Sequence, residues 1–157
     1  MNNKITIRTY TNQETDRAFI FGLSPRLSEV AGLHWHADGV MQKMQDEYIA
    51  EMLNQTLTPN ITLIAETKEG ALGFIHTCAH QDSISGEICA TVPLLAVSPK
   101  AQGMGVGQLL IQAAETWAKK QGYRLLHLEV FANNIKARGF YQSQGFEEET
   151  LHMIKPL

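Results

Sequence analysis

The amino-acid sequence predicts a mixed α/β (α+β) fold, with a central, mostly antiparallel sheet, one parallel strand–helix–strand crossover and flanking helices. Two extended segments, 61–66 and 71–80, are joined by a short turn ending at Gly70, which is typical of an antiparallel hairpin. Further along, a long amphipathic helix separates two extended segments, and such a unit places its strands parallel. No linker or repeat interrupts the pattern, so we expect one domain over residues 1–157.

Before the hairpin, one strand and two helices are expected. Apolar and polar residues alternate at the start, which indicates a strand with one buried face. The first helical pattern is interrupted or ended at Ser24-Pro25, because the residue before proline avoids helical geometry. The expected elements are a strand at 4–10, a helix at 12–23, a loop at 33–39 and a helix at 40–57.

After the hairpin, the clearest element is a helix beginning at Val106. Its apolar residues recur every three or four positions, as on a helix with one buried face. Lys119 and Lys120 suit the negative end of the helix dipole, and Gly122 ends the helix. Around this helix we expect strands at 87–97 and 123–130, a helix at 134–144 and a closing strand at 146–154.

Composition narrows the class of protein. A length of 157 residues with 44% hydrophobic content suffices for one core, and a net charge of −3 argues against binding to nucleic acid. No apolar run approaches the ~18 residues of a membrane span, and the first residues lack a signal region. We therefore expect a cytoplasmic protein with no membrane or nucleic-acid partner. Cys78 and Cys89 lack metal-type spacing and are expected to be small buried thiols.

The most informative stretch runs from Leu94 to Gly107, where an apolar strand enters a glycine-rich turn that opens a helix. Backbone N–H groups at a helix start are unpaired and attract phosphate oxygens. A P-loop is excluded because Gln108-Leu109 stands where Lys-Ser or Lys-Thr is needed. A nicotinamide-binding turn lacks its third glycine, although Glu129 lies about where a ribose-binding acid belongs. Too little chain follows for a doubly wound sheet.

Two sequence blocks together resemble the GNAT superfamily of acetyl-CoA-dependent N-acetyltransferases. The pattern Gln102-x-x-Gly105-x-Gly107 is similar to its pyrophosphate loop. The segment from Asn134 to Phe146 is similar to its pattern Asn-x-x-Ala-x-x-Phe-Tyr-x-x-x-Gly-Phe. The resemblance covers residues 61–157 well and implies a GNAT-like single domain that uses acetyl-CoA as cosubstrate and no metal.

The resemblance also implies which residues meet the cofactor. Main-chain groups of the strand would pair with the pantetheine arm, and amides of the turn would hold the pyrophosphate. Asn134 matches a cofactor-contacting asparagine, and Lys136 or Arg138 could meet the 3′-phosphate, although both also suit a solvated surface. The implied cofactor-binding residues are Leu95, Ala96, Val97, Gln102, Gly103, Met104, Gly105, Val106, Gly107, Gln108, Asn134 and Tyr141.

Three residues are candidates for the chemistry that the resemblance implies. An amine must lose a proton before it attacks a thioester, and the leaving thiolate needs a hydrogen-bond donor. Tyr141 matches the tyrosine near the cofactor sulfur. Glu129 and Glu87 each match a place where family members carry a glutamate base, and a chain of water molecules is a third option.

The resemblance implies direct acetyl transfer in a ternary complex to a primary amine of a small molecule, such as an aminosugar or polyamine. Alternatives are a protein N-terminal or lysine acetyltransferase, and a sensor that binds acyl-CoA without turnover. Two histidines alone make no metal site, so the cluster His34-Trp35-His36 is not expected to bind a metal. The resemblance implies instead that this loop lines the acceptor cleft, because it precedes the second helix, which shapes substrate access in many members of the family. A homodimer is the arrangement typical of the family.

Overall fold

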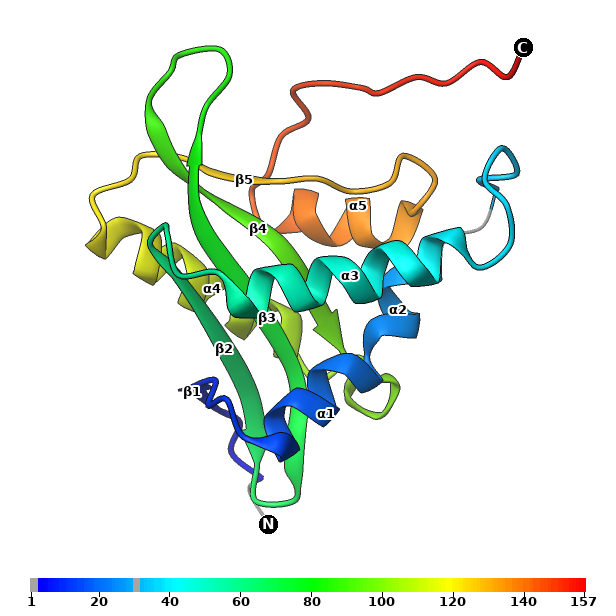
Figure 1. Ribbon diagram of the computed structural model, residues 1–157. Coiled ribbons are helices and arrows are strands. Elements are labelled where there is room, and N and C mark those ends of the chain that lie inside the picture. The colour runs from blue at the N-terminus through cyan, green and yellow to red at the C-terminus, as the bar shows by residue number, and fades with distance from the viewer. Residues whose placement is uncertain (1–2, 30–31) are drawn as a thin grey trace.

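The computed structural model describes residues 3–29 and 32–157 (Figure 1). Five strands form one sheet in the order β1-β2-β3-β4-β5, with antiparallel neighbours except for the parallel pair β4 and β5. The strands are β1 (Thr6–Thr9), β2 (Asn60–Thr67), β3 (Gly70–Gln81), β4 (Ile88–Val97) and β5 (Leu126–Leu128). The α-helices are α1 (Glu14–Gly22), α2 (Ser24–Ser28), α3 (Val40–Asn54), α4 (Val106–Lys120) and α5 (Ile135–Ser143), and a short 3₁₀ turn, η1, covers Pro99–Ala101.

Helices cover both faces of this sheet, which gives the molecule two apolar layers (Figure 1). Successive residues of a strand point to opposite faces of the sheet, so Leu94 and Leu95 of β4 pack into different apolar clusters. On one face, α4 packs with Leu110 and Ile111 against β2 and β3. On the other, Ile49 of α3 packs with residues of α1 and β3. Within the described ranges, no helix is both long and apolar enough to cross a membrane.

The expected fold class is confirmed, including the single parallel crossover from β4 through α4 to β5. Helix α4 begins at Val106, and Gly122 (φ +82°) lies just past its end. Four of its five buried residues lie on the predicted stripe, and the fifth, Ile111, was not predicted. Near the start of the chain the helical region is divided. Pro25 lies in the first turn of the separate helix α2, where a missing N–H costs nothing.

The predicted closing strand at 146–154 is wrong. Phe146 packs against the α4 side of the core, but residues 147–157 are exposed and contain no strand. Alternating side chains make a strand possible, but a strand forms only where a neighbour supplies hydrogen bonds. In the described part of the chain, no strand pairs with the outer edge of β5.

Candidate functional site

The site begins where β4 and β5 separate. The two strands pair only from Ala90 with Leu126 to Val92 with Leu128. Beyond Val92, β4 continues to Val97 with β3 on one side, and no described strand lies on its other side. An extra residue in β4 opposite His76 and Cys78, next to Pro93, marks the point of separation. The free edge of β4 can therefore hydrogen-bond an extended ligand.

This free edge leads straight into the glycine-rich turn. Gly103 and Gly105 have φ values of +79° and +78°, a region where a side chain would be strained. Residues 102–105 are exposed, and Gly105 is the N-cap of α4 but has no side chain with which to cap it. The N–H groups of the first helical turn therefore face an open corner, as an anion-binding site requires.

Gly107 has a second function that the sequence did not indicate. It lies within α4, and a Cβ added there would be 3.0 Å from Cζ of Phe140 in α5. The absent side chain thus lets the aromatic ring pack against the start of α4. A glycine is therefore required at position 107 for the packing of α5 against α4, and it also leaves the backbone accessible to a ligand.

The N-terminus of α5 lies beside the same corner. The side chain of Asn134 caps the helix by accepting a hydrogen bond from the N–H of Ala137 at 3.2 Å. Nζ of Lys136 lies 3.4 Å from Oε1 of Gln102, so an exposed cation stands next to the glycine-rich turn. Arg138, in contrast, is bound to Glu148 and to the carbonyl of Ala132. Lys136 is therefore the better placed of the two cations to meet a phosphate.

Tyr141 lies on α5 and packs against the α4 side of the core. Its ring is 5.8 Å from the ring of Phe146 and 5.4 Å from that of Phe140. Burial raises the pKa of Tyr141 to about 12. The phenol therefore stays protonated at neutral pH and can donate a hydrogen bond.

Glu129 is exposed and directly follows β5, on the far side of the opening from the glycine-rich turn. It lies close to α3: burial raises the pKa of Tyr48, and negative charge at Cys78, Glu129 and Glu51 raises it further. Glu129 and Glu51 are therefore near enough to Tyr48 for their charges to raise the pKa of its phenol. Sequence reasoning missed Tyr48, although its position four residues after Met44 and four before Met52 extends the apolar stripe of α3.

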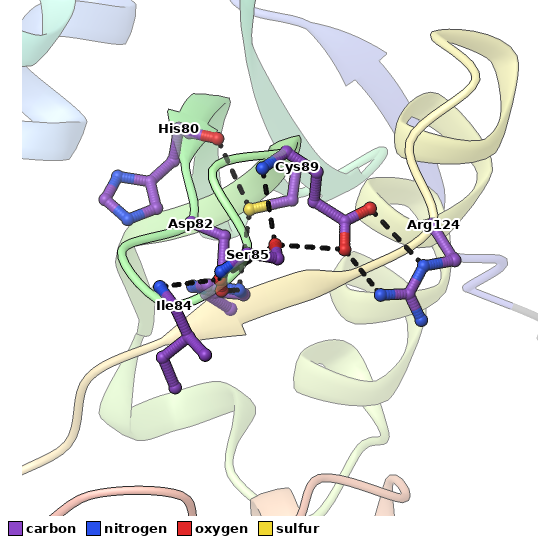
Figure 2. Close-up of polar contacts among 8 residues, drawn as sticks. His80, Asp82, Ile84, Ser85, Cys89 and Arg124 are labelled. Atoms are coloured by element: carbon purple, nitrogen blue, oxygen red, sulfur yellow. Dashed lines mark hydrogen bonds and ion pairs between the residues drawn. The ribbon is translucent and has the colours of Figure 1, made fainter.

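Glu87 lies elsewhere, at the start of β4 in the turn between β3 and β4. Its carboxylate accepts a hydrogen bond from Nε of Arg124 at 3.3 Å (Figure 2). This ion pair lowers the pKa of Glu87. Val92 lies five positions after Glu87, which at about 3.3 Å per strand residue is roughly 16 Å. The structure thus brings Glu129 to the opening and keeps Glu87 away from it.

A polar cluster accompanies Glu87 in this turn. Asp82 accepts hydrogen bonds from the N–H groups of Ile84 and Ser85, and its other oxygen lies 3.2 Å from Nε2 of His127 (Figure 2). Sγ of Cys89 is 3.4 Å from the same nitrogen. The same nitrogen, Nε2 of His127, contacts both the Cys89 thiol and the Asp82 carboxylate. While its N–H group donates to Asp82, this nitrogen cannot accept a proton from the Cys89 thiol. Cys78 and Cys89 are both free and buried, as predicted.

The loop before α3 carries the cluster His34-Trp35-His36. A concave surface is lined by eight residues of the segment 32–41, His34 and His36 among them. A Cβ added to Gly32 would lie 2.9 Å from Nδ2 of Asn133, so this loop touches the connection between β5 and α5. The loop that carries the two histidines therefore lies beside the connection that follows Glu129. Across the described ranges, no three His, Cys, Asp or Glu side chains are grouped to hold a metal ion.

Comparison with known proteins agrees with this geometry. The family model described as the acetyltransferase (GNAT) family matches residues 28–146. An uncharacterised N-acetyltransferase of Bacillus subtilis is 33% identical over 58% of this chain and 61% of its own length. A mycothiol acetyltransferase of Jonesia denitrificans is 36% identical over 59% of this chain but only 28% of its own length. The chain thus spans less than two thirds of either relative.

An aminoglycoside N(6′)-acetyltransferase of Klebsiella aerogenes is matched more fully, at 33% identity over 71% of this chain and 75% of its own. Among solved structures, a provisionally assigned acetyl transferase from Pyrococcus furiosus has a TM-score of 0.77 at 22% identity, covering 98% of this chain and 100% of its own. An aminoglycoside N-acetyltransferase in complex with CoA has a TM-score of 0.70 at 21% identity, covering 100% and 97%. These structures share the fold of this chain.

Proposed function

Because the chain belongs to the GNAT family of acetyltransferases, we propose that it transfers an acetyl group from acetyl-CoA to a primary amine. One observation carries the proposal: no strand of the described residues pairs with the edge of β4 from Pro93 to Val97, and this edge leads through η1 to the exposed turn 102–105, the glycine corner. A pantetheine arm fits a free strand edge, and a diphosphate fits unpaired amides at a helix start.

We assign cofactor binding to the main chain of this edge and corner. Leu95 to Val97 would hydrogen-bond the pantetheine arm. The amides of Gly103 and of residues 105–108 would hold the diphosphate, because the N–H groups of Gln102 and Met104 already donate to the carbonyls of Pro99 and Ala101. Val106 is buried, so only its N–H group faces the ligand. Lys136 adds a cation beside Gln102, whereas Asn134 acts by capping α5 in front of the corner.

The transfer needs a base, and we assign Glu129. The amine gives a proton to the base, directly or through water, and the nitrogen then attacks the thioester carbon. Glu129 is exposed beside the opening, whereas Glu87 is bound to Arg124 at the opposite end of β4. A carboxylate held by a guanidinium is a weaker base, which favours Glu129 over Glu87.

Tyr141 is assigned to the leaving group. When the carbon–sulfur bond breaks, negative charge collects on the sulfur. A phenol with a pKa of about 12 is a weaker acid than a thiol with a pKa of about 8.5, so full proton transfer would be uphill. Tyr141 therefore stabilises the thiolate by donating a hydrogen bond, and the thiol gains its proton from solvent.

The acceptor we propose is a cationic small molecule, such as an aminosugar or polyamine. The charges of Glu51 and Glu129 both raise the pKa of Tyr48, so this side of the opening carries negative charge, and carboxylates attract ammonium groups. Similarity to acetyltransferases named for aminoglycosides and for mycothiol supports this class. A protein N-terminus or lysine is the second candidate. We further propose that residues 1–157 act as one domain, in the cytoplasm, as a homodimer.

A thiol-release assay with acetyl-CoA and a panel of amines tests the proposal. We expect turnover with at least one polycationic amine, and a loss of at least about tenfold in kcat for Tyr141→Phe, with CoA affinity by calorimetry kept. Binding of CoA without turnover on any amine, unchanged by Tyr141→Phe, would instead identify a sensor. No binding of CoA would refute the assignment of the glycine corner.

A further inference from the structure

A histidine of β5 lies two positions before Glu129, at the base of the opening. His127 is in the part of β5 that pairs with β4, one residue before the last paired position. Its neighbours Leu126 and Leu128 pack on the α4 side of the core, so His127 points to the opposite face of the sheet. Glu129 comes two positions later in the same extended segment and therefore lies on the face of His127. This is the face that α3 covers, where the charge of Glu129 raises the pKa of Tyr48.

A carboxylate is held at one nitrogen of this imidazole. Oδ2 of Asp82 lies 3.2 Å from Nε2 of His127, and Asp82 is only 5% exposed. Oδ1 of Asp82 accepts hydrogen bonds from the N–H groups of Ile84 at 2.9 Å and Ser85 at 2.7 Å, and from the Ser85 hydroxyl at 3.0 Å (Figure 2). The two bonds from Ser85 lower the pKa of Asp82, and the N–H group of Ile84 lowers it further. Asp82 is therefore an anion at neutral pH, and a carboxylate anion only accepts hydrogen bonds.

This carboxylate determines which nitrogen of His127 carries the proton. Because Asp82 only accepts, Nε2 of His127 is the N–H group, and Nδ1 keeps its lone pair in the neutral imidazole. Nδ1 makes no hydrogen bond with the residues that the structure describes, and it is not a buried atom without a partner, so it is open to solvent. Cys89 does not compete for Nδ1, because its thiol donates to the carbonyl of His80 at 3.3 Å and burial raises its pKa.

The proposed reaction needs such a proton acceptor. Each acetyl transfer moves one proton from an ammonium group to the base, and the base must lose this proton before the next transfer. Imidazole is a stronger base than carboxylate, with ordinary pKa values of about 6.5 and about 4.3, so a proton passes from a carboxylic acid to an imidazole downhill. Two strand positions are about 6.6 Å apart, and a water molecule can bridge side chains at this spacing.

We propose that His127, oriented by Asp82, relays the proton of the acceptor amine from Glu129 to solvent. An N–H bond of the substrate ammonium breaks, and its proton joins the Glu129 carboxylate, which becomes a neutral acid. Glu129 passes the proton through a water molecule to Nδ1 of His127, so an imidazolium forms beside the Asp82 anion. The imidazolium releases a proton from Nδ1 to bulk water, and both side chains regain their starting charges. This inference rests on the proposed function, with Glu129 as the base.

The tautomer of His127 is measurable without turnover. Nitrogen-15 NMR of the full chain at pH 7.5 should show the proton on Nε2, and His127→Gln identifies the signals. In Asp82→Asn, the amide oxygen would keep the bonds from Ile84 and Ser85, so the NH2 group would face Nε2 and donate to it. The imidazole proton should then move to Nδ1. A proton on Nδ1 in the natural protein, or a tautomer unaffected by Asp82→Asn, would overturn the proposal.

Thiol-release kinetics with an accepted amine test the relay itself. Glutamine at position 127 is polar but cannot carry the proton, so His127→Gln should lower kcat at least about tenfold and leave both KM values unchanged. Imidazole added to His127→Ala should restore part of kcat. His80→Gln is the matched control, because the His80 ring packs edge-to-face on that of His127, with the centroids 5.4 Å apart, and only its main chain bonds Cys89. A loss that His80→Gln reproduces, or one that imidazole does not restore, would make the role of His127 merely structural.

The double variant distinguishes a relay from two independent effects. If the two residues act in series, Glu129→Gln combined with His127→Gln should lose no more kcat than Glu129→Gln alone. Losses that multiply would overturn the relay. A natural protein that acetylates no amine would refute the proposed function and the relay with it, whereas full activity of His127→Gln would refute the relay alone.

Discussion

Lowering the pH from neutral should weaken the fold through His76, a residue of β3 with no exposed surface. Its Nδ1 lies 2.7 Å from Oγ1 of Thr62, while Nε2 is buried without a partner among the described residues. Burial lowers the pKa of His76 from 6.5 to about 4. The native state therefore keeps this imidazole neutral at pH values where the unfolded chain protonates it.

The size of the effect follows from proton linkage. Between pH 6.5 and pH 4 the unfolded state binds one more proton than the native state, so the free energy of unfolding falls as the pH falls. The pKa of His76 differs by 2.5 between the unfolded and native states, which at 1.36 kcal/mol per pKa unit corresponds to about 3.4 kcal/mol of stability. Of this free energy of unfolding, about 2.5 kcal/mol is lost when the pH falls to 4.5. Such a loss is a large part of the 5–15 kcal/mol typical of a domain.

Urea unfolding at pH 7.5 and pH 4.5 measures this loss, with His76→Asn as the comparison. Asparagine places an amide near the position of Nδ1 and can keep the bond to Thr62, but it does not titrate. The variant should be less stable at pH 7.5 and lose about 2.5 kcal/mol less than the natural protein between the two pH values. Arg8 lowers the pKa of Asp16, whose contribution is lost only at lower pH. Equal losses in the two proteins would refute the assignment to His76.

Three further predictions concern the site. Gly107→Val should destabilise the fold by about 1–3 kcal/mol in urea, because the new side chain meets the Phe140 ring, whereas Gly139→Ala has open space and should be neutral or stabilising. Lys136→Ala should weaken CoA about two- to fivefold by calorimetry and reduce the salt dependence of binding, and an unchanged affinity would remove this cation from the phosphate site. Glu129→Gln should lower kcat at least about tenfold, mainly at low pH, and a larger effect of Glu87→Gln would move the base there.

The central part of the fold was predictable because its determinants are local. The stripe of α4, the glycines before it and the hairpin turn at Gly70 each impose a conformation through neighbouring residues. The division of the first helical region into α1 and α2 at Pro25 was less predictable. A proline ends one helix and suits the first turn of the next, so sequence alone does not decide whether a second helix follows.

The C-terminal strand was wrongly predicted for a different reason. Alternation of Leu151, His152 and Met153 shows which face would be buried, but it does not supply the neighbour that accepts the hydrogen bonds. The same limit applied to the two glutamates. Glu87 and Glu129 have the same side-chain chemistry, and the fold distinguishes them by the ion pair of Glu87 with the distant Arg124 and by the distance of each from the opening. Pairings between residues far apart in the chain require the fold.

The two sequence blocks that suggested the family are in contact in the structure, which explains why they occur together. Gly107 of the first block leaves room for Phe140 of the second, and Gln102 of the first accepts a hydrogen bond from Lys136 of the second. The glycine corner therefore owes its position to α5 as well as to β4. A change in either block should alter diphosphate binding through the other, so effects of paired substitutions at Gly107 and Phe140 should not add.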